Sequence, residues 1–271
     1  DLFSPDLAET LLLLSRCYAA QGRGSPARAC LRQALRIVLR HRGRNSPEAG
    51  EAFCRLGEWH ARARQPRQAL ILLGQGLALL FRFPGSLPPA LPSFLLTLSR
   101  CYQEKGRLEE AEGAIQQAWR YCQRIPGVPL RERWIIMEEW AECRARQGRF
   151  REAAGMLADE IGEITRLHGH RFSGLSTPLE NLALILTRQG NPERTTRLLT
   201  WAYRLLPSRA PRSRQAAPHL LRLLGGQWLG RGRYPRALSL LRLAEKKARS
   251  LPELHDQRLS IQLDLAYTLL R

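Results

Sequence analysis

A glycine recurs along this chain at a constant spacing, and it constrains the fold more than any other feature. Its clearest setting runs from Leu98 to Ala111, where an apolar helical pattern stops at a glycine and a second helical pattern restarts. Successive copies lie 42 residues apart, and Arg64 takes the place of the glycine in one of them. A fixed period of this length indicates a repeat array, so each copy predicts a helical hairpin. The turn glycines are Gly22, Gly106, Gly148, Gly190 and Gly232.

Fixed columns of residues accompany this turn. Before the turn, a large residue is followed directly by a small one, and after the turn each copy has an aliphatic residue. A small residue beside a large one lets two helix backbones approach closely, so these registers predict a regular helix crossing. The large column is Leu14, Leu56, Leu98, Trp140, Leu182 and Leu224. The small column is Ser15, Gly57, Ser99, Ala141, Ala183 and Gly225. The aliphatic column is Leu31, Leu73, Ile115, Leu157, Leu199 and Leu241.

Helix start signals place the units along the chain. Serine followed by proline at Ser4, Ser25 and Ser46 predicts an N-cap with proline in the first turn. Segments rich in proline and glycine separate the units and predict inter-repeat loops. We therefore expect one domain over residues 1–271, made of units at 4–45, 46–87, 88–129, 130–171, 172–213 and 214–254. Residues 255–271 are expected to form a capping helix or the start of a further repeat.

These columns carry a family resemblance. The small residue of the first helix, the turn glycine and the alanine of the second helix make the chain similar to tetratricopeptide repeat proteins. The usual unit of that family has 34 residues, whereas the 42-residue unit resembles the kinesin-light-chain type of repeat. The resemblance implies an all-α fold, a right-handed α-solenoid of about six hairpins with a terminal helix. One departure is Glu160, which breaks a second small column.

The sequence carries no catalytic, cofactor or metal-binding motif, so we predict a protein that is not an enzyme. Three neighbouring glutamates, Glu138, Glu139 and Glu142, fit a solvated helix face or a patch for a basic partner better than acid–base chemistry. The six cysteines lack metal or redox spacing and are expected to be small buried side chains in a reducing cytosol. No apolar run is long enough to span a membrane. The first residues are neither a signal peptide nor a natural initiator, so we expect part of a longer protein.

Positive charge is concentrated at the two ends of the chain. The net charge is +19, divided into +8 over residues 1–103, −2 over 104–163 and +13 over 164–271, and nearly all basic residues are arginine. Arginine suits carboxylate and phosphate recognition, although the bias can equally reflect codon usage. Four arginines spaced by four residues predict an outer stripe of one helix that could bind a polyanion. They are Arg28, Arg32, Arg36 and Arg40.

Tetratricopeptide proteins present their first helices on a concave surface, and the resemblance carries this expectation onto two columns of the chain. The signs of their charges alternate, so the columns predict either binding of an acidic or mixed-charge peptide or ion pairing between neighbouring repeats. The candidate partner-binding residues are Arg16, Glu58, Arg62, Arg100, Glu104, Glu142, Arg146 and Arg188.

Three functions remain open on these observations. The preferred hypothesis is a non-enzymatic scaffold that binds a protein or peptide on its concave face. The first alternative is a nucleic-acid or polyanion-binding module, which lacks the exposed aromatic residues usual for base stacking. The second alternative is a sensor or regulatory arm of a larger signalling protein. The fold by itself does not decide among them.

Overall fold

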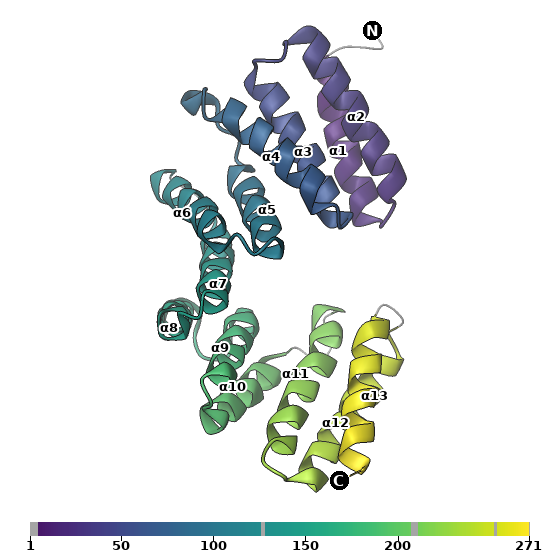
Figure 1. Cartoon of the computed structure of the whole chain (residues 1–271), viewed down its shortest axis with the longest axis vertical. Helices are drawn as coiled ribbons and strands as arrows, with labels where there is room; N and C mark the ends of the chain where they lie inside the picture. Colours follow the sequence, from purple (N-terminus) through teal and green to yellow (C-terminus); the bar gives the residue numbers. More distant parts are fainter. Residues whose placement is uncertain (1–4, 126–127, 207–210, 252–253, 271) are drawn as a thin grey trace. The chain divides into compact units, whose positions relative to one another are not determined.

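The computed structural model describes residues 5–125, 128–206, 211–251 and 254–270. Within these ranges the chain forms thirteen α-helices and no β-strand, which confirms the predicted all-α class (Figure 1). Two short 3-10 helices, η1 (Pro84–Ser86) and η2 (Ser173–Leu175), lie in loops. The α-helices are α1 (Pro5–Ala20), α2 (Gly24–His41), α3 (Pro47–Arg62), α4 (Pro66–Leu80), α5 (Leu91–Glu104), α6 (Leu108–Arg124), α7 (Leu130–Arg146), α8 (Phe150–His168), α9 (Ser176–Arg188), α10 (Pro192–Leu205), α11 (Pro211–Leu229), α12 (Tyr234–Arg249) and α13 (His255–Leu269).

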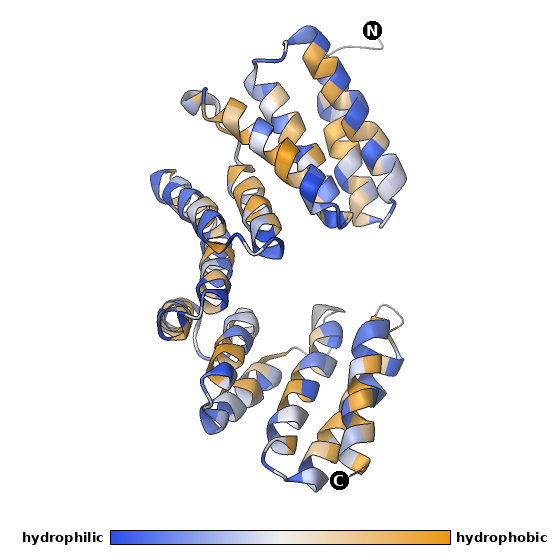
Figure 2. Ribbon diagram, in the orientation of Figure 1, coloured by the Kyte–Doolittle hydropathy of each residue, from blue (hydrophilic) through white to orange (hydrophobic). Residues whose placement is uncertain are grey.

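The chain divides into two compact units, residues 1–139 and 140–271, and the division falls within α7. In the first unit, α1 packs against α2, α3 against α4 and α5 against α6. In the second unit, α9 packs against α10 and α11 against α12, while α13 packs on α12. Helices such as α2 and α6 show hydrophilic and hydrophobic residues alternating along their length (Figure 2), as expected where one side of a helix is buried.

The hairpin turns share one backbone geometry. All five turn glycines have a left-handed φ between +67° and +81°, a conformation that L-residues with a side chain disfavour. In the first turn the amide of Arg23, just after the glycine, donates to the carbonyl of Tyr18 at 2.9 Å, the six-to-one bond of a Schellman cap. The turn at Arg64 keeps the same bond, from Gln65 to His60 at 2.9 Å. Arg64 itself has a φ of +58° and is the one non-glycine residue of the described chain with a positive φ.

The small column lies against the aliphatic column within a hairpin, as the sequence predicts. A Cβ atom added to Gly57 would lie 2.8 Å from the Cγ of Leu73, and one added to Gly225 would lie 2.8 Å from the Cγ of Leu241. Both distances are too short for a real Cβ contact, so a larger residue would force the helices apart. All six small residues are buried, and the aliphatic column is at most 4% exposed.

Two predicted core positions in α1 are wrong. Leu14 of the large column is 41% exposed and Cys17 is exposed, whereas the remaining five cysteines are buried. The physical reason lies in the packing of the first helices: α3, α5 and α11 each also pack against the second helix of the preceding hairpin, whereas α1 packs chiefly against α2. One side of α1 is therefore open among the described residues.

Of the predicted start signals, the one at Ser46 is confirmed and the one at Ser25 is wrong. Ser46 is the N-cap of α3, where its side chain accepts a hydrogen bond from the amide of Ala49 at 3.1 Å and Pro47 follows. Ser25 is not a cap, because α2 begins at Gly24 and the capping position is Arg23, without a side-chain bond. Ser4 lies outside the described residues.

Candidate partner-binding groove

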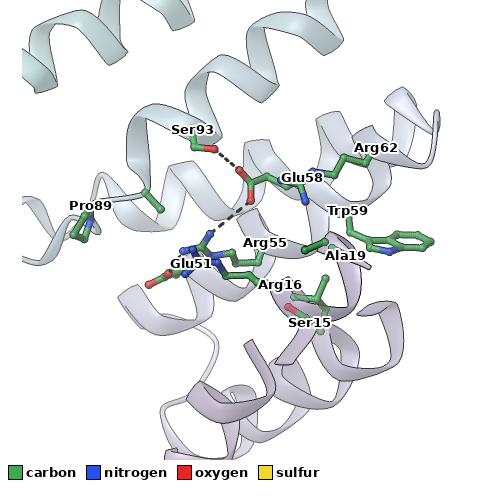
Figure 3. A pocket seen from close by; sticks show the side chains of 13 residues that line it. Ser15, Arg16, Ala19, Glu51, Arg55, Glu58, Trp59, Arg62, Pro89 and Ser93 are labelled. Atoms are coloured by element: carbon green, nitrogen blue, oxygen red, sulfur yellow. Dashed lines mark hydrogen bonds and ion pairs between the residues drawn. The ribbon is translucent and has the colours of Figure 1, made fainter. Parts of the chain in front are cut away.

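The first helices of the first unit line a groove of about 650 Å³ (Figure 3). One wall is α1, with Ser15, Arg16, Ala19 and Ala20, and α3 forms the floor. The segment that enters α5 closes the far end. The groove therefore lies on first helices, where the resemblance places the partner surface, and its size is that of a peptide- or ligand-sized site.

A single stripe of α3 supplies the charged side chains of the floor. Glu51, Arg55, Glu58 and Arg62 follow one another at spacings of four, three and four residues, so they lie on the same side of the helix. Arg55 contacts both acidic neighbours, with its Nη2 atom 3.1 Å from Glu51 and its Nη1 atom 3.8 Å from Glu58. Both carboxylates are thus partly neutralised by one guanidinium within the groove.

Glu58 also forms a contact between hairpins. Its carboxylate accepts a hydrogen bond of 2.6 Å from the hydroxyl of Ser93 in α5, as Figure 3 shows. The residue is 7% exposed. A buried carboxylate requires partners, and Ser93 and Arg55 provide them. We therefore assign Glu58 to holding α3 and α5 together at the groove.

Trp59 forms the side of the groove next to the first hairpin turn. Its indole N–H donates to the carbonyl of Gly24 at 3.1 Å, and the guanidinium of Arg28 lies 5.0 Å from its ring centroid. His60 packs edge-on against the same ring at 5.0 Å. These contacts fix the indole, so the groove presents a rigid aromatic wall.

Arg16 and Arg62 differ from the other charged groups of the groove. Both side chains are exposed and line it, and neither has an ion pair within the described residues. Because Arg16, Arg55 and Arg62 outnumber Glu51 and Glu58, the lining of the groove carries a net positive charge. Their planar forks are suited to bind a carboxylate through paired hydrogen bonds.

A second, more apolar pocket of about 350 Å³ adjoins this groove, and both are lined by Pro89, Ala90 and Ser93. Leu96 of α5 and Ile135 of α7 line its apolar part. Arg100 also lines it, and its guanidinium is held by Glu139, which raises the pKa of Arg100 further. The chain therefore offers a charged groove that continues into an apolar one within the first unit.

The remaining predicted partner-binding residues do not line the groove. Glu104 has a distant ion pair with Arg64 at 3.9 Å. Glu142 and Arg146 pair with each other on α7 at 2.8 Å. Arg188 is exposed at the end of α9. Arg100 and Glu104 thus pair with residues of neighbouring hairpins, Glu139 and Arg64, whereas Glu142 and Arg146 pair within one helix.

Three of the four arginines predicted to form the outer stripe of α2 are exposed. Arg32 and Arg36 are exposed on α2, and Arg40 is exposed near its end. Arg28 is half-buried because its guanidinium lies over the Trp59 ring. Arg28 is therefore less accessible than the other three arginines of the expected stripe.

Several groove residues escaped the sequence reasoning. Arg55 and Glu51 share the helix stripe of Glu58 and Arg62, so the 4-3-4 spacing could have identified them. Trp59 and Ser93 offered no such signal, because their roles depend on contacts with other helices.

No group of three or more His, Cys, Asp or Glu residues is placed to hold a metal ion within the described chain. None of the helices, as far as they are described, is long and apolar enough to cross a membrane.

The fold and the groove define an α-helical repeat protein of the solenoid class. More particularly, residues 6–80 match the tetratricopeptide repeat family model. No curated protein sequence matches the chain.

Solved tetratricopeptide structures share the fold, including repeats of the kinesin-light-chain kind. Kinesin light chain-like repeats of Podospora anserina match at a TM-score of 0.62 and 20% identity, covering 74% of this chain and 95% of theirs. BtubC of P. vanneervenii matches at a TM-score of 0.62 and 14% identity, covering 90% of this chain and 92% of its own. A signal-transduction ATPase with a tetratricopeptide repeat sensor, from Pyrococcus horikoshii, reaches a TM-score of 0.76 at 12% identity, covering 96% of this chain and 38% of its own. At these identities the likeness concerns the fold alone.

Proposed function

We propose that this chain is a non-enzymatic scaffold that binds an extended, acidic segment of a partner protein in the groove of α1, α3 and α5. The observation that carries the proposal is the pair of unpaired guanidiniums, Arg16 and Arg62, lining one groove on first helices. Tetratricopeptide repeats commonly serve as protein-interaction scaffolds, and the fold agrees with that use.

The acidic preference follows from which charges are already satisfied. Arg55 is shared by Glu51 and Glu58, and Arg100 is held by Glu139. A partner carboxylate would therefore gain most at Arg16 and Arg62, where it displaces only water. A basic partner would have to compete with Arg55 for the same glutamates. We therefore expect the partner segment to be acidic and not of mixed charge.

A library of random peptides displayed on phage and selected on the purified protein tests this proposal. Enriched peptides are labelled, and their dissociation constants are measured by fluorescence anisotropy. We expect the double variant Arg16→Gln with Arg62→Gln to weaken binding about tenfold or more, because each charged hydrogen bond contributes about 1.5 kcal/mol or more and 1.4 kcal/mol is tenfold.

The matched control is Arg32→Gln with Arg36→Gln, which removes the same number of exposed arginines from α2. The proposal would be overturned if the enriched peptides bound more weakly to the control variant and equally well to the groove variant. So would a selection that enriches no peptide. Enrichment of basic peptides that bind in the groove would leave the scaffold standing and contradict its acidic preference.

The polyanion alternative keeps one supporting observation, the exposed Arg32, Arg36 and Arg40 on α2. Labelled single-stranded RNA distinguishes it, because phosphate binding releases counterions and its affinity falls linearly on a log–log plot against salt. A steep slope that flattens in the Arg32→Gln with Arg36→Gln variant would favour the polyanion module. The other alternative, a regulatory arm of a larger protein, stays a prediction. In that role the chain would use the same groove.

A further inference from the structure

The outward side of α12 carries basic residues and no carboxylate. The helix packs against α11 and α13, and its buried residues are Ala237, Leu241, Ala244 and Ala248. Neighbouring second helices such as α10 and α12 do not pack closely on each other, so a neighbouring hairpin leaves the outward side open. Four basic residues of this side are exposed and have no ion pair within the described residues, and we call them the basic row: Arg236, Arg242, Lys246 and Lys247.

Glu245, the one acidic residue of α12, does not neutralise the basic row. Its side chain is 17% exposed and accepts a hydrogen bond of 2.9 Å from Arg249. Gln262 of α13 also donates a hydrogen bond to it, so this carboxylate is engaged by Arg249 and α13. The four cations of the basic row therefore face solvent without a counter-charge from their own helix.

The repeat register shows that this charge is particular to α12. Arg236 stands where α6 has Glu110 and α8 has Glu152. In both of those hairpins the glutamate pairs with an arginine three residues earlier, at 2.7 and 2.6 Å. In α12 both positions are arginine, Arg233 and Arg236, so two cations replace an internal ion pair. A position that departs from the local rule of its own fold is where function is expected.

The two lysines of the basic row argue against codon usage as the origin of the charge. Lys246 and Lys247 are two of the three lysines of the chain. Both codons for lysine begin with two adenines, so a codon preference that enriches arginine does not supply them. Lys247 also stands where α8 has Glu163, which is a second reversal of charge at the same register.

The basic row begins beside an ordered aromatic cluster. The guanidinium of Arg236 lies 4.9 Å from the centroid of the Trp228 ring, and the guanidinium of Arg231 lies 5.3 Å from the same centroid. A guanidinium that is already stacked on a ring loses less conformational entropy when it binds a ligand. Its planar fork suits phosphate oxygens, which it can bind through paired hydrogen bonds.

We propose that the basic row binds the sugar–phosphate backbone of a nucleic acid. From Arg236 to Lys247 the helix rises about 16 Å, which spans about five phosphates of one strand at about 3.4 Å each. Contacts to phosphates carry no sequence information, so this binding needs no exposed aromatic residue to read bases. It is a second function, separate from the peptide groove in the first unit and from the predicted stripe on α2.

A membrane surface fits the basic row less well than a nucleic acid does. Helices that lie on a membrane insert an apolar face into it. The apolar face of α12 is used for packing, and its one exposed large apolar residue is Leu243, at 39%.

Fluorescence anisotropy with labelled single-stranded RNA of about 16 nucleotides, measured over a series of salt concentrations, tests the proposal. We expect the affinity to fall linearly on a log–log plot as salt rises. The double variant Arg242→Gln with Lys246→Gln should reduce the slope by about 1.4, because each phosphate contact on a single strand contributes about 0.7.

The matched control is Arg32→Gln with Arg36→Gln, which removes two exposed cations at the same spacing of four from α2 and should keep the parent slope. The exchange Arg242→Lys with Lys246→Arg retains both charges and should also keep it. All four positions are exposed, and thermal melting should show that the variants remain folded.

Three results with RNA would overturn the proposal: no binding, an unchanged slope in the α12 double variant, or an equal reduction in the α2 control. Vesicles that contain phosphatidylserine provide the comparison with a membrane. Binding to these vesicles and not to RNA, lost in the α12 double variant, would assign the basic row to an anionic membrane and overturn its assignment to nucleic acid.

Discussion

Replacing Arg64 by glycine should stabilise the first unit. Arg64 occupies the turn position that holds glycine in the five other copies, and its backbone has the same left-handed φ, +58°. A side chain in this region brings Cβ close to the following carbonyl oxygen and costs about 1–2 kcal/mol. Glycine removes that contact, and the Schellman bond from Gln65 to His60 requires no side chain at position 64.

The gain is smaller than the strain itself, because glycine also makes the unfolded chain more flexible. That entropy offsets about 0.4–1 kcal/mol, which leaves a net stabilisation of about 0.5–1 kcal/mol. The ion pair that Arg64 makes with Glu104 is long, at 3.9 Å, and the Arg64 side chain is 89% exposed, so its loss matters little. For a chain of this size the melting temperature should rise by about 1–4 °C.

Thermal unfolding and urea titration, both followed by circular dichroism, measure the effect. Two controls separate the backbone from the side chain. Arg64→Ala removes the guanidinium and keeps the strained turn, so its stability should stay within about 0.5 kcal/mol of the parent. Gly106→Ala is the reciprocal change: a Cβ there would meet no atom within 4 Å, so the expected loss of about 1 kcal/mol is purely conformational.

The reasoning fails if Arg64→Gly leaves the melting temperature unchanged or lowers it while Gly106→Ala destabilises as expected. That result would mean that the left-handed turn at position 64 carries no strain worth relieving. An Arg64→Ala variant as stable as Arg64→Gly would assign the gain to the side chain instead.

Three further outcomes follow from the packing. Ala183→Leu should overpack the crossing of α9 and α10 and cost about 1–3 kcal/mol in urea titration. Ser46→Ala should cost about 1 kcal/mol because it removes the N-cap of α3, whereas Ser25→Ala, which removes no cap, should cost little. Iodoacetamide at about pH 8 should label the native chain once, at Cys17, because thiolates are the reactive form and burial raises the pKa of Cys101 to about 11; intact mass counts the labels.

Much of the fold could be predicted because its signals are local and repeated. The turn glycine, the left-handed turn and the large-then-small pair act within one hairpin, so a single sequence displays them at every copy. Leu14 shows where this ends: its burial depends on a preceding hairpin, which the column itself does not reveal. Ser25 shows a second limit, because a serine before a proline can act as an N-cap but the helix need not begin there.

The groove was predictable only in part, for a related reason. Periodicity places Arg16, Glu58 and Arg62 on first helices, and the structure brings these three into one groove. Periodicity cannot show which charges are already paired, because pairing depends on side chains from other helices. Trp59 illustrates this, since its role rests on the carbonyl of Gly24, the first residue of α2, and on Arg28.

Net charge is a poor guide to partner choice in this chain because it does not tell which arginines are already paired with a carboxylate. Arg100 meets Glu139 39 residues further on, and Arg222 meets Asp264 after one full period of 42. Such pairs form because the repeat brings the first helices of neighbouring hairpins close to each other. They tie one hairpin to the next, and a partner would have to break them to use the arginine. Recognition is then left to arginines without such a neighbour, and Arg16 and Arg62 meet that condition within a groove.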